Sequence, residues 1–370
     1  MGRLRGIRSS PFLMTWKSTG NGLYKSFGAL DKVVRQSVVP CPMRRASVPL
    51  LVLLSVPALG VAAPTRRPAP PLPSYILPTD ASEKDRAVGE AARRALGNLP
   101  GAVVAMDPHS GRVLAIVNPN YGVAHAYEPC SVIKIVVAIA GLSEGVLTPE
   151  TTYNCSGGCW MWPGHGTIDL RRALAVSCNT FFERVGERLG YAKIEHYARL
   201  LGFGSSSGIN VPGEAPGHLP VSVATDAVGH LSSHGAGITT TPLQLAVALS
   251  AAINGGIVYE PQVGVVAGFV PKERWRLPPG TVLDPLVDGF LGAVNEGSAS
   301  AAFDPDIVVA GKTGSCGQMG WFASYAPADH PELVVVVFLR WGNGHHASAV
   351  AGRIYEDLYK PPAAAPPRAR

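Results

Sequence analysis

The chain has 370 residues, of which 46% are hydrophobic, so it can bury the core of one large domain or two modest ones. The formal net charge of +6 originates at the N-terminus, because residues 1–67 contain 11 of the 32 Lys and Arg residues and one acidic residue, Asp31. The rest of the chain carries more acidic than basic side chains, which argues against a nucleic-acid-binding surface on the folded part.

The N-terminal segment has the pattern of a secretory signal peptide. The basic sequence MRR (residues 43–45) precedes the apolar run SVPLLVLLSVPALGVAA (residues 47–63), which ends in small residues and contains a G-x-A cleavage pattern. Two prolines interrupt this short run, so a cleaved leader is favoured over a retained membrane anchor. We therefore predict a signal peptide at residues 43–63, preceded by a non-native or disordered extension at 1–42. The protein is expected in the periplasm or at the outer face of the cytoplasmic membrane.

Export implies an oxidising compartment, which makes the cysteines informative. Of six cysteines, Cys41 falls in the leader, and the other five are Cys130, Cys155, Cys159, Cys178 and Cys316. An odd number leaves at least one thiol free or paired with another molecule. Cys155 and Cys159 could close a small loop through a disulfide. A zinc site would need more ligands than the one nearby histidine, His165, so we expect neither a metal nor another cofactor.

The predicted elements describe one domain between two proline-rich segments. Residues 64–80 form an extended linker, and residues 361–370 form a disordered tail. The domain at 81–360 begins with a helix and a hairpin, and it ends with three strands and a helix. Its middle has helical patterns, and they are predicted at residues 131–145, 170–190, 193–202 and 241–256. This order predicts an α+β fold, in which early and late strands form an antiparallel sheet flanked by helices, with an all-helical middle subdomain.

Ser131 and Lys134 stand three residues apart in the apolar segment YEPCSVIKIVVAIAG. On a helix, residues i and i+3 share a face, so the hydroxyl and the amine would lie within reach of each other. Burial disfavours the charged form of lysine and lowers its pKa, which provides a neutral amine as the base for a serine nucleophile. An isolated S-x-x-K pattern is weak support, because a chain this long contains about one by chance.

Two further motifs strengthen the interpretation of the S-x-x-K pattern as catalytic. Ser177-Cys178-Asn179 follows in a helical region, and Lys312-Thr313-Gly314 follows a strand-like segment. S-x-x-K, S-x-N and K-T-G in this order form the signature of penicillin-binding proteins and serine β-lactamases. The segments GHGTIDLRRALAVSCNTFF and VAGKTGSCGQMGWFASYAP also resemble family segments. From about Gly101 to about Tyr359, the chain thus resembles the transpeptidase domain of penicillin-binding proteins.

The resemblance implies a role for each catalytic candidate. Ser131 would attack the carbonyl of a D-Ala–D-Ala bond, and Lys134 would take its proton. Lys312 would help to keep Lys134 neutral through the repulsion of like charges. Ser177 would relay a proton to the leaving amine, and Asn179 would hydrogen-bond Lys134 and the substrate amide.

The resemblance also assigns the substrate-binding residues. Lys312 and Thr313 would bind the terminal carboxylate, and the strand through Gly314 would pair with the extended peptide. Ser315 and Ser131 would each supply one backbone N–H to an oxyanion hole. The backbones of residues 131 and 315 would therefore be close, so a disulfide between the flanking Cys130 and Cys316 is a further hypothesis.

The implied function is that of an exported serine D,D-transpeptidase in cell-wall cross-linking. It would acylate on the D-Ala-D-Ala stem peptides of peptidoglycan and bind β-lactams such as penicillin covalently. A separate glycosyltransferase is a candidate partner, and nucleic acid is not. Fewer than 40 residues separate the predicted signal peptide from Gly101, so the N-terminal pedestal of full-length members is expected to be absent.

Other functions stay open at this point. A D,D-carboxypeptidase or a β-lactamase would use the same acyl-enzyme, and for a β-lactamase Glu214 is the candidate base that activates water. The surrounding PGEAPGHLP matches the penicillin-binding segment better than a deacylating loop. A non-catalytic β-lactam sensor would need a signalling helix or a partner domain. Cys178 could itself be a nucleophile, with His165 or His234 as its partner.

Overall fold

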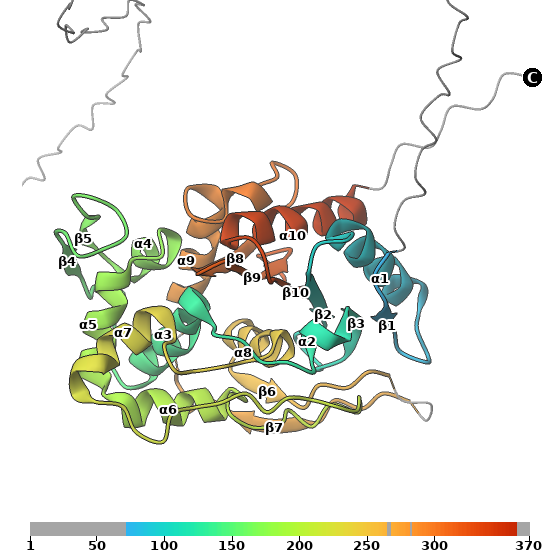
Figure 1. Cartoon of the computed structure of the whole chain (residues 1–370), viewed down its shortest axis with the longest axis horizontal. Helices are drawn as coiled ribbons and strands as arrows, with labels where there is room; N and C mark the ends of the chain where they lie inside the picture. The colour runs from blue at the N-terminus through green and yellow to red at the C-terminus, as the bar shows by residue number, and fades with distance from the viewer. Residues whose placement is uncertain (1–71, 265–267, 282, 361–370) are drawn as a thin grey trace, which may run out of the picture. The chain divides into compact units, whose positions relative to one another are not determined.

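The computed structural model describes residues 72–264, 268–281 and 283–360 (Figure 1). The predicted leader, most of the linker and the C-terminal tail lie outside these ranges. The strands are β1 (Tyr75–Ile76), β2 (Gly101–Met106), β3 (Val113–Val117), β4 (Tyr153–Cys155), β5 (Gly166–Ile168), β6 (Ile257–Tyr259), β7 (Glu273–Arg276), β8 (Ala310–Cys316), β9 (Met319–Ala326) and β10 (Leu333–Leu339).

The helices are α1 (Glu83–Leu96), α2 (Pro119–Gly122), α3 (Ile133–Ser143), α4 (Leu170–Ala175), α5 (Asn179–Leu189), α6 (Tyr191–Leu200), α7 (Val228–His234), α8 (Pro242–Ile253), α9 (Asp284–Asn295) and α10 (Gly344–Tyr359). Three short 3₁₀ turns are η1 (Cys130–Val132), η2 (Thr225–Ala227) and η3 (Ser300–Ala302). Within the described ranges, no helix has both the length and the apolar character that crossing a membrane requires.

A six-stranded antiparallel sheet occupies the centre of the domain, in the order β1-β3-β2-β10-β9-β8. Strand β2 comes from the start of the domain and pairs with β10 from its end, with Val104 opposite Val336. The predicted α+β fold, with a sheet built from early and late strands, is therefore confirmed.

Helices cover both faces of this sheet, as Figure 1 shows for α10 and α8. Successive side chains of a strand point to opposite faces, and in this sheet both faces are apolar. Val103 and Val337 belong to a buried cluster with α1 and α10, whereas Val104 and Val336 belong to a second cluster with α3 and α8. Because both faces are buried, the central strands are continuous apolar runs rather than alternating ones.

The middle of the domain is mainly helical, with α3 at its centre. Side chains from Ile133 to Gly141 are buried all round this helix, because α5, α6, α7 and α8 pack against it. The helix predicted at residues 131–145 is thus present as α3. The middle also contains the two-stranded sheets β4–β5 and β6–β7, which the sequence analysis did not predict.

Two other predicted segments differ from the structure. The single helix predicted at 170–190 is two helices, α4 and α5, because Ser177 has a left-handed backbone with φ of 55° that a right-handed helix cannot contain. The S-x-N motif therefore lies in a turn and at a helix start. Within the predicted linker, Tyr75 and Ile76 form β1 and pair with β3, so this part of the linker belongs to the sheet.

Candidate active site

Ser131 lies in η1, the short turn that leads into α3. The preceding residue, Cys130, has a φ of 52°, a conformation that glycine adopts more readily than other residues. The turn exposes the Ser131 hydroxyl at a pocket, while the following helix passes into the core.

Lys134 is completely buried beneath Ser131. Its Nζ lies 3.0 Å from Ser131 Oγ and 2.7 Å from Asn179 Oδ1. It also lies 3.2 Å from the Oγ and 3.0 Å from the backbone oxygen of Ser177. Burial lowers the pKa of Lys134 to about 7, since the apolar surroundings disfavour the ammonium. A large fraction of this amine is therefore neutral near physiological pH.

Ser177 occupies the turn between α4 and α5, where it meets a second buried lysine. Ser177 Oγ is 2.9 Å from Lys312 Nζ, in addition to its contact with Lys134. The pKa of Lys312 lies well below its ordinary value, first because the side chain is buried and then because Lys134 is close. One hydroxyl thus bridges two amines that cannot both be charged at low cost.

Strand β8 carries Lys312, Thr313, Gly314 and Ser315 along one side of the site. Thr313 Oγ1 lies 2.5 Å from the hydroxyl of Ser298 at the pocket wall. A Cβ on Gly314 would lie 3.0 Å from the backbone oxygen of Pro129 and about as close to Val132. A larger residue here would therefore push β8 and the turn that holds Ser131 apart by a few tenths of an ångström.

A pocket of about 330 Å³ lies between these segments. It is lined by residues of η1, the α4–α5 turn, β8 and neighbouring loops, and these are Ser131, Trp160, Val176, Ser177, Asn179, His234, Ser298, Thr313 and Ser315. The predicted catalytic and substrate-binding candidates are thus brought together around one cavity. Ser298 was not predicted, and no motif in the sequence marks it as a pocket residue.

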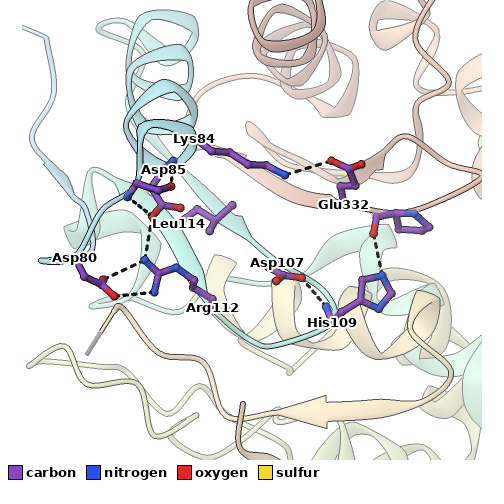
Figure 2. A pocket seen from close by; sticks show the side chains of 10 residues that line it. Asp80, Lys84, Asp85, Asp107, His109, Arg112, Leu114 and Glu332 are labelled. Carbon is purple, nitrogen blue, oxygen red and sulfur yellow. Dashed lines mark hydrogen bonds and ion pairs between the residues drawn. The ribbon is translucent and has the colours of Figure 1, made fainter. Parts of the chain in front are cut away.

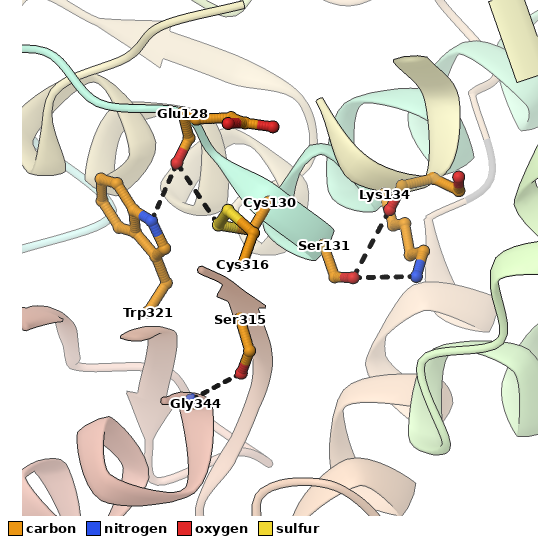
Figure 3. The surroundings of a disulfide bond; sticks show 9 residues. Glu128, Cys130, Ser131, Lys134, Ser315, Cys316, Trp321 and Gly344 are labelled. Atoms are coloured by element: carbon orange, nitrogen blue, oxygen red, sulfur yellow. Dashed lines mark hydrogen bonds between the residues drawn. A yellow bond between two sulfur atoms is a disulfide. The ribbon is translucent and has the colours of Figure 1, made fainter. Parts of the chain in front are cut away.

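A disulfide between Cys130 and Cys316 closes one side of the site (Figure 3). It links η1 to the end of β8, and its Cα atoms are 5.5 Å apart. Next to it, Ser315 Oγ accepts a hydrogen bond of 2.8 Å from the N–H of Gly344, and this bond holds the end of β8 against α10. The hypothesised disulfide is therefore present, and it flanks both Ser131 and Ser315.

The other cysteine hypotheses do not agree with the structure. Cys155 and Cys159 are free, so the predicted small-loop disulfide is wrong. Cys178 is fully buried and is not among the residues that line the pocket, which excludes it as the nucleophile there. His234 does line the pocket, and its Nε2 lies 3.3 Å from Asn179 Nδ2.

One cluster of potential metal ligands near the pocket consists of Glu183, His230 and His234. Ser233 Oγ lies 3.2 Å from Glu183 Oε1 and 2.7 Å from His234 Nδ1. The His230 and His234 rings stack with centroids 4.2 Å apart. These contacts join α7 to Glu183 of α5, so hydrogen bonding and stacking explain why the three side chains lie together, without a bound ion.

A second cavity, of about 500 Å³, lies near α1 and the β2–β3 turn (Figure 2). Its charged groups are paired, since Arg112 contacts Asp80 and Asp85 at 3.0 Å each and Lys84 contacts Glu332 at 3.2 Å. These ion pairs connect α1 to the sheet. The serine in its lining, Ser82, is the N-cap of α1 and accepts a hydrogen bond of 3.1 Å from the N–H of Asp85, so this cavity is not the candidate catalytic site.

A family model described as the penicillin binding protein transpeptidase domain matches residues 101–360. The chain belongs to this family. Its three motifs lie within the matched residues, and the family accounts for their order in the sequence.

Relatives of this penicillin-binding protein transpeptidase domain include curated proteins that share 29% identity with it. One is stage V sporulation protein D of Bacillus subtilis, aligned over 317 residues that cover 69% of this chain and 48% of the relative. Another is the peptidoglycan D,D-transpeptidase MrdA of Haemophilus influenzae, aligned over 348 residues that cover 71% of this chain and 53% of the relative. The chain thus spans about half the length of these curated relatives.

Solved structures share the same architecture. One of them concerns the structural coordination of polymerization and crosslinking by a peptidoglycan synthase complex. It is 26% identical, with a TM-score of 0.63, over 76% of this chain and 61% of that one. The penicillin-binding transpeptidase fold is therefore present in the described residues.

Proposed function

We propose that this protein is an exported serine D,D-transpeptidase that cross-links peptidoglycan stem peptides. One observation carries the proposal: the buried amine of Lys134, with a pKa of about 7, lies 3.0 Å from the Ser131 hydroxyl. A neutral amine in this place can act as the general base for this serine. The membership of the penicillin-binding transpeptidase family supports the same reaction.

The proposed reaction begins with acylation of Ser131. Its Oγ attacks the carbonyl carbon of the D-Ala–D-Ala peptide bond, and the hydroxyl proton passes to Lys134. The C–N bond then breaks, and the departing D-Ala amine takes a proton through Ser177, which contacts both lysines. The amine of a second stem peptide attacks the acyl ester, and its surplus proton returns to Ser131 as the cross-link forms.

Strand β8 provides the proposed platform for the donor peptide. It is the last strand in the order of the six-stranded sheet, so an extended peptide can add to its outer edge. Thr313 and Ser315 line the pocket beside this edge, and Lys312 lies beneath it with its Nζ 2.9 Å from Ser177 Oγ. These residues suit the terminal carboxylate of the stem, and backbone N–H groups of Ser131 and Ser315 suit the developing oxyanion.

A β-lactamase activity is disfavoured by the position of Glu214. Its carboxylate accepts hydrogen bonds from the N–H groups of Ser207 at 2.7 Å and Gly208 at 3.3 Å. Glu214 is not among the residues that line the pocket, so it is not placed to activate water for deacylation. A long-lived penicillin adduct on Ser131 is the expected consequence.

The proposed setting is the periplasm or the outer face of the cytoplasmic membrane, which the signal-peptide pattern at residues 43–63 supports. A separate glycosyltransferase is the proposed partner, because a transpeptidase acts on strands that another enzyme has polymerised. The likeness to a protein from a peptidoglycan synthase complex supports this assignment.

The test combines labelled penicillin with a stem pentapeptide and an amine acceptor. Wild-type protein is expected to form a stable adduct and a cross-linked product, whereas Ser131→Ala forms neither. Ser206→Ala, which changes an exposed serine that is not among the pocket residues, is the matched control. Rapid penicillin turnover would indicate a β-lactamase, and release of D-Ala without cross-linking would indicate a carboxypeptidase. A stable adduct without any peptide product would indicate a sensor.

A further inference from the structure

We infer that His234 is a positioning residue for the proposed reaction, because its imidazole holds the side-chain amide of Asn179 in the orientation that serves Lys134. His234 is the last residue of α7 and lines the catalytic pocket. It belongs to none of the three sequence motifs. The role rests on the proposed function and on the part that Asn179 has in it, as a partner of Lys134 and of the substrate amide.

The amide of Asn179 has two chemically different ends, and they face different side chains. Lys134 Nζ donates to Asn179 Oδ1 over 2.7 Å. Asn179 Nδ2 lies 3.3 Å from His234 Nε2. An amide nitrogen only donates, so His234 Nε2 is the acceptor and carries no hydrogen. One Nδ2 hydrogen is thus directed to His234, and the other is available to an acceptor in the pocket that Asn179 lines.

The other ring nitrogen of His234 has partners that select the same tautomer. His234 Nδ1 lies 2.7 Å from Ser233 Oγ. Ser233 Oγ also lies 3.2 Å from two groups that only accept, Glu183 Oε1 and the backbone oxygen of His230. The Ser233 hydrogen points to one of these, so its oxygen accepts the hydrogen on His234 Nδ1. Every donor from the Lys134 amine onward therefore faces an acceptor.

The surroundings also favour an uncharged ring. Burial lowers the pKa of His234, and nearby His230 and Lys134 lower it further. A second hydrogen, on Nε2, would set an N–H group against the Asn179 Nδ2 group, and two donors cannot form a hydrogen bond with each other. Neutral His234 with its hydrogen on Nδ1 is thus the form that fits these contacts.

Close packing fixes the end of α7 beside the reacting serine. Gly235, which follows the helix, has a left-handed backbone with φ of 76°, and a Cβ on it would clash with the ring of Pro129 next to η1. On the same side, Ser131 Oγ lies 3.4 Å from the backbone oxygen of Ser233. The helix end therefore lies directly against the catalytic turn, and the imidazole that it carries has a fixed place in the pocket.

The sequence alone made His234 a candidate only as the partner of a Cys178 nucleophile. The contact with Asn179 could not be predicted, because the two residues lie on different helices and meet through the packing of α5 against α7. A ring that only filled the pocket wall would make no use of its Nε2 as an acceptor. Substitutions that separate the shape of the side chain from its acceptor can therefore test the role.

The main test compares acylation by labelled penicillin in two variants of His234. His234→Gln places an amide oxygen near the position of Nε2 and can accept from Asn179, so it should retain most of the wild-type rate. His234→Phe fills the space with a ring that cannot accept, so it should acylate about 10- to 100-fold more slowly. His230→Phe, which keeps the stacked ring one turn earlier on the helix, is the matched control and should leave the rate unchanged.

A third variant acts on the far side of the ring. Ser233→Ala removes the acceptor of the Nδ1 hydrogen and leaves the imidazole in place. The hydrogen can then move to Nε2, where it opposes the Asn179 amide, so acylation should fall by a smaller factor than in His234→Phe. Circular dichroism spectra show whether each variant is folded. Wild-type rates in both His234→Phe and Ser233→Ala would overturn the positioning role, and so would a His234→Gln variant as slow as His234→Phe.

The tautomer of His234 is a readout that does not depend on activity. In protein with ¹⁵N-labelled histidine, the signals of this ring are those missing from the spectrum of His234→Gln. At about pH 8, they should show a hydrogen on Nδ1 and none on Nε2. The opposite tautomer, or a charged ring at this pH, would overturn the inference. If wild-type protein never forms a penicillin adduct, the proposed function fails, and the tautomer still decides whether His234 accepts from Asn179.

Discussion

At the scale of single residues, the site depends on two buried amines around Ser177. Lys134 and Lys312 both contact its hydroxyl, at 3.2 and 2.9 Å, and both are fully buried. Burial lowers the pKa of each lysine, and for Lys312 the nearby Lys134 lowers it further. The pocket therefore holds bases that are neutral under conditions in which an exposed lysine is charged.

The first prediction concerns the pH dependence of acylation. Lys134 must be neutral to take the Ser131 proton, and its pKa is lowered to about 7, so the neutral form increases as the pH rises through this value. The rate of acylation by labelled penicillin should therefore rise through about pH 7 and level off above it. The measurement uses saturating labelled penicillin at a series of pH values. A rate that falls over this interval would contradict a base role for Lys134.

A second prediction at this scale replaces the base. Lys134→Met keeps a long apolar side chain in the buried position but removes the amine, so acylation should fall about 10²- to 10⁴-fold. Lys193→Met, on the exposed side of α6, is the matched control and should acylate as the wild type does. Circular dichroism spectra of both variants show whether they are folded. Equal acylation rates for the two variants would argue for a different base.

At the scale of elements, the site is assembled where η1, the α4–α5 turn and β8 meet. The three motifs can be recognised in the sequence, because each of them is a local pattern, and the fold places them around one pocket. It did not predict the break between α4 and α5, since the left-handed Ser177 is held by Lys134 and Lys312 from other elements. The two small sheets were also missed, because three-residue strands carry almost no periodic signal.

The disulfide between η1 and β8 leads to a prediction about stability. It closes a loop with a sequence separation of 186 residues, and such cross-links typically contribute about 2–5 kcal/mol. The double variant Cys130→Ser with Cys316→Ser should lower the free energy of unfolding by this amount in urea. A reducing agent should shift the wild type to the same midpoint and leave the variant unchanged. Equal midpoints for the oxidised wild type and the variant would show that the bond adds no stability.

At the scale of the whole molecule, the two ends of the domain form one sheet. Strand β2 pairs with β10, so the residues that carry the S-x-x-K motif and those that carry K-T-G are joined through a common core. The order of early strands, helical middle and late strands along the chain predicted a sheet made from both ends of the domain. The strand order could not be predicted from it, because pairing depends on contacts between segments far apart in the chain.

Phe338 of β10 offers the test at this scale. Its ring stacks on Tyr127 with centroids 4.2 Å apart and lies 4.5 Å from Trp321, so it connects the sheet to the segment that precedes Ser131. Phe338→Ala should lower the free energy of unfolding by about 3–5 kcal/mol, because the side chain is fully buried.

The matched control for this substitution is Phe303→Ala, at a side chain that is 56% exposed, and it should change the free energy of unfolding by less than about 0.5 kcal/mol. Urea unfolding followed by tryptophan fluorescence gives both values. Phe338 does not line the pocket, so the folded fraction of Phe338→Ala should still acylate on Ser131. If both variants unfold at the same urea concentration, the sheet does not depend on this aromatic contact, and the connection between the core and the catalytic turn must be made by other residues.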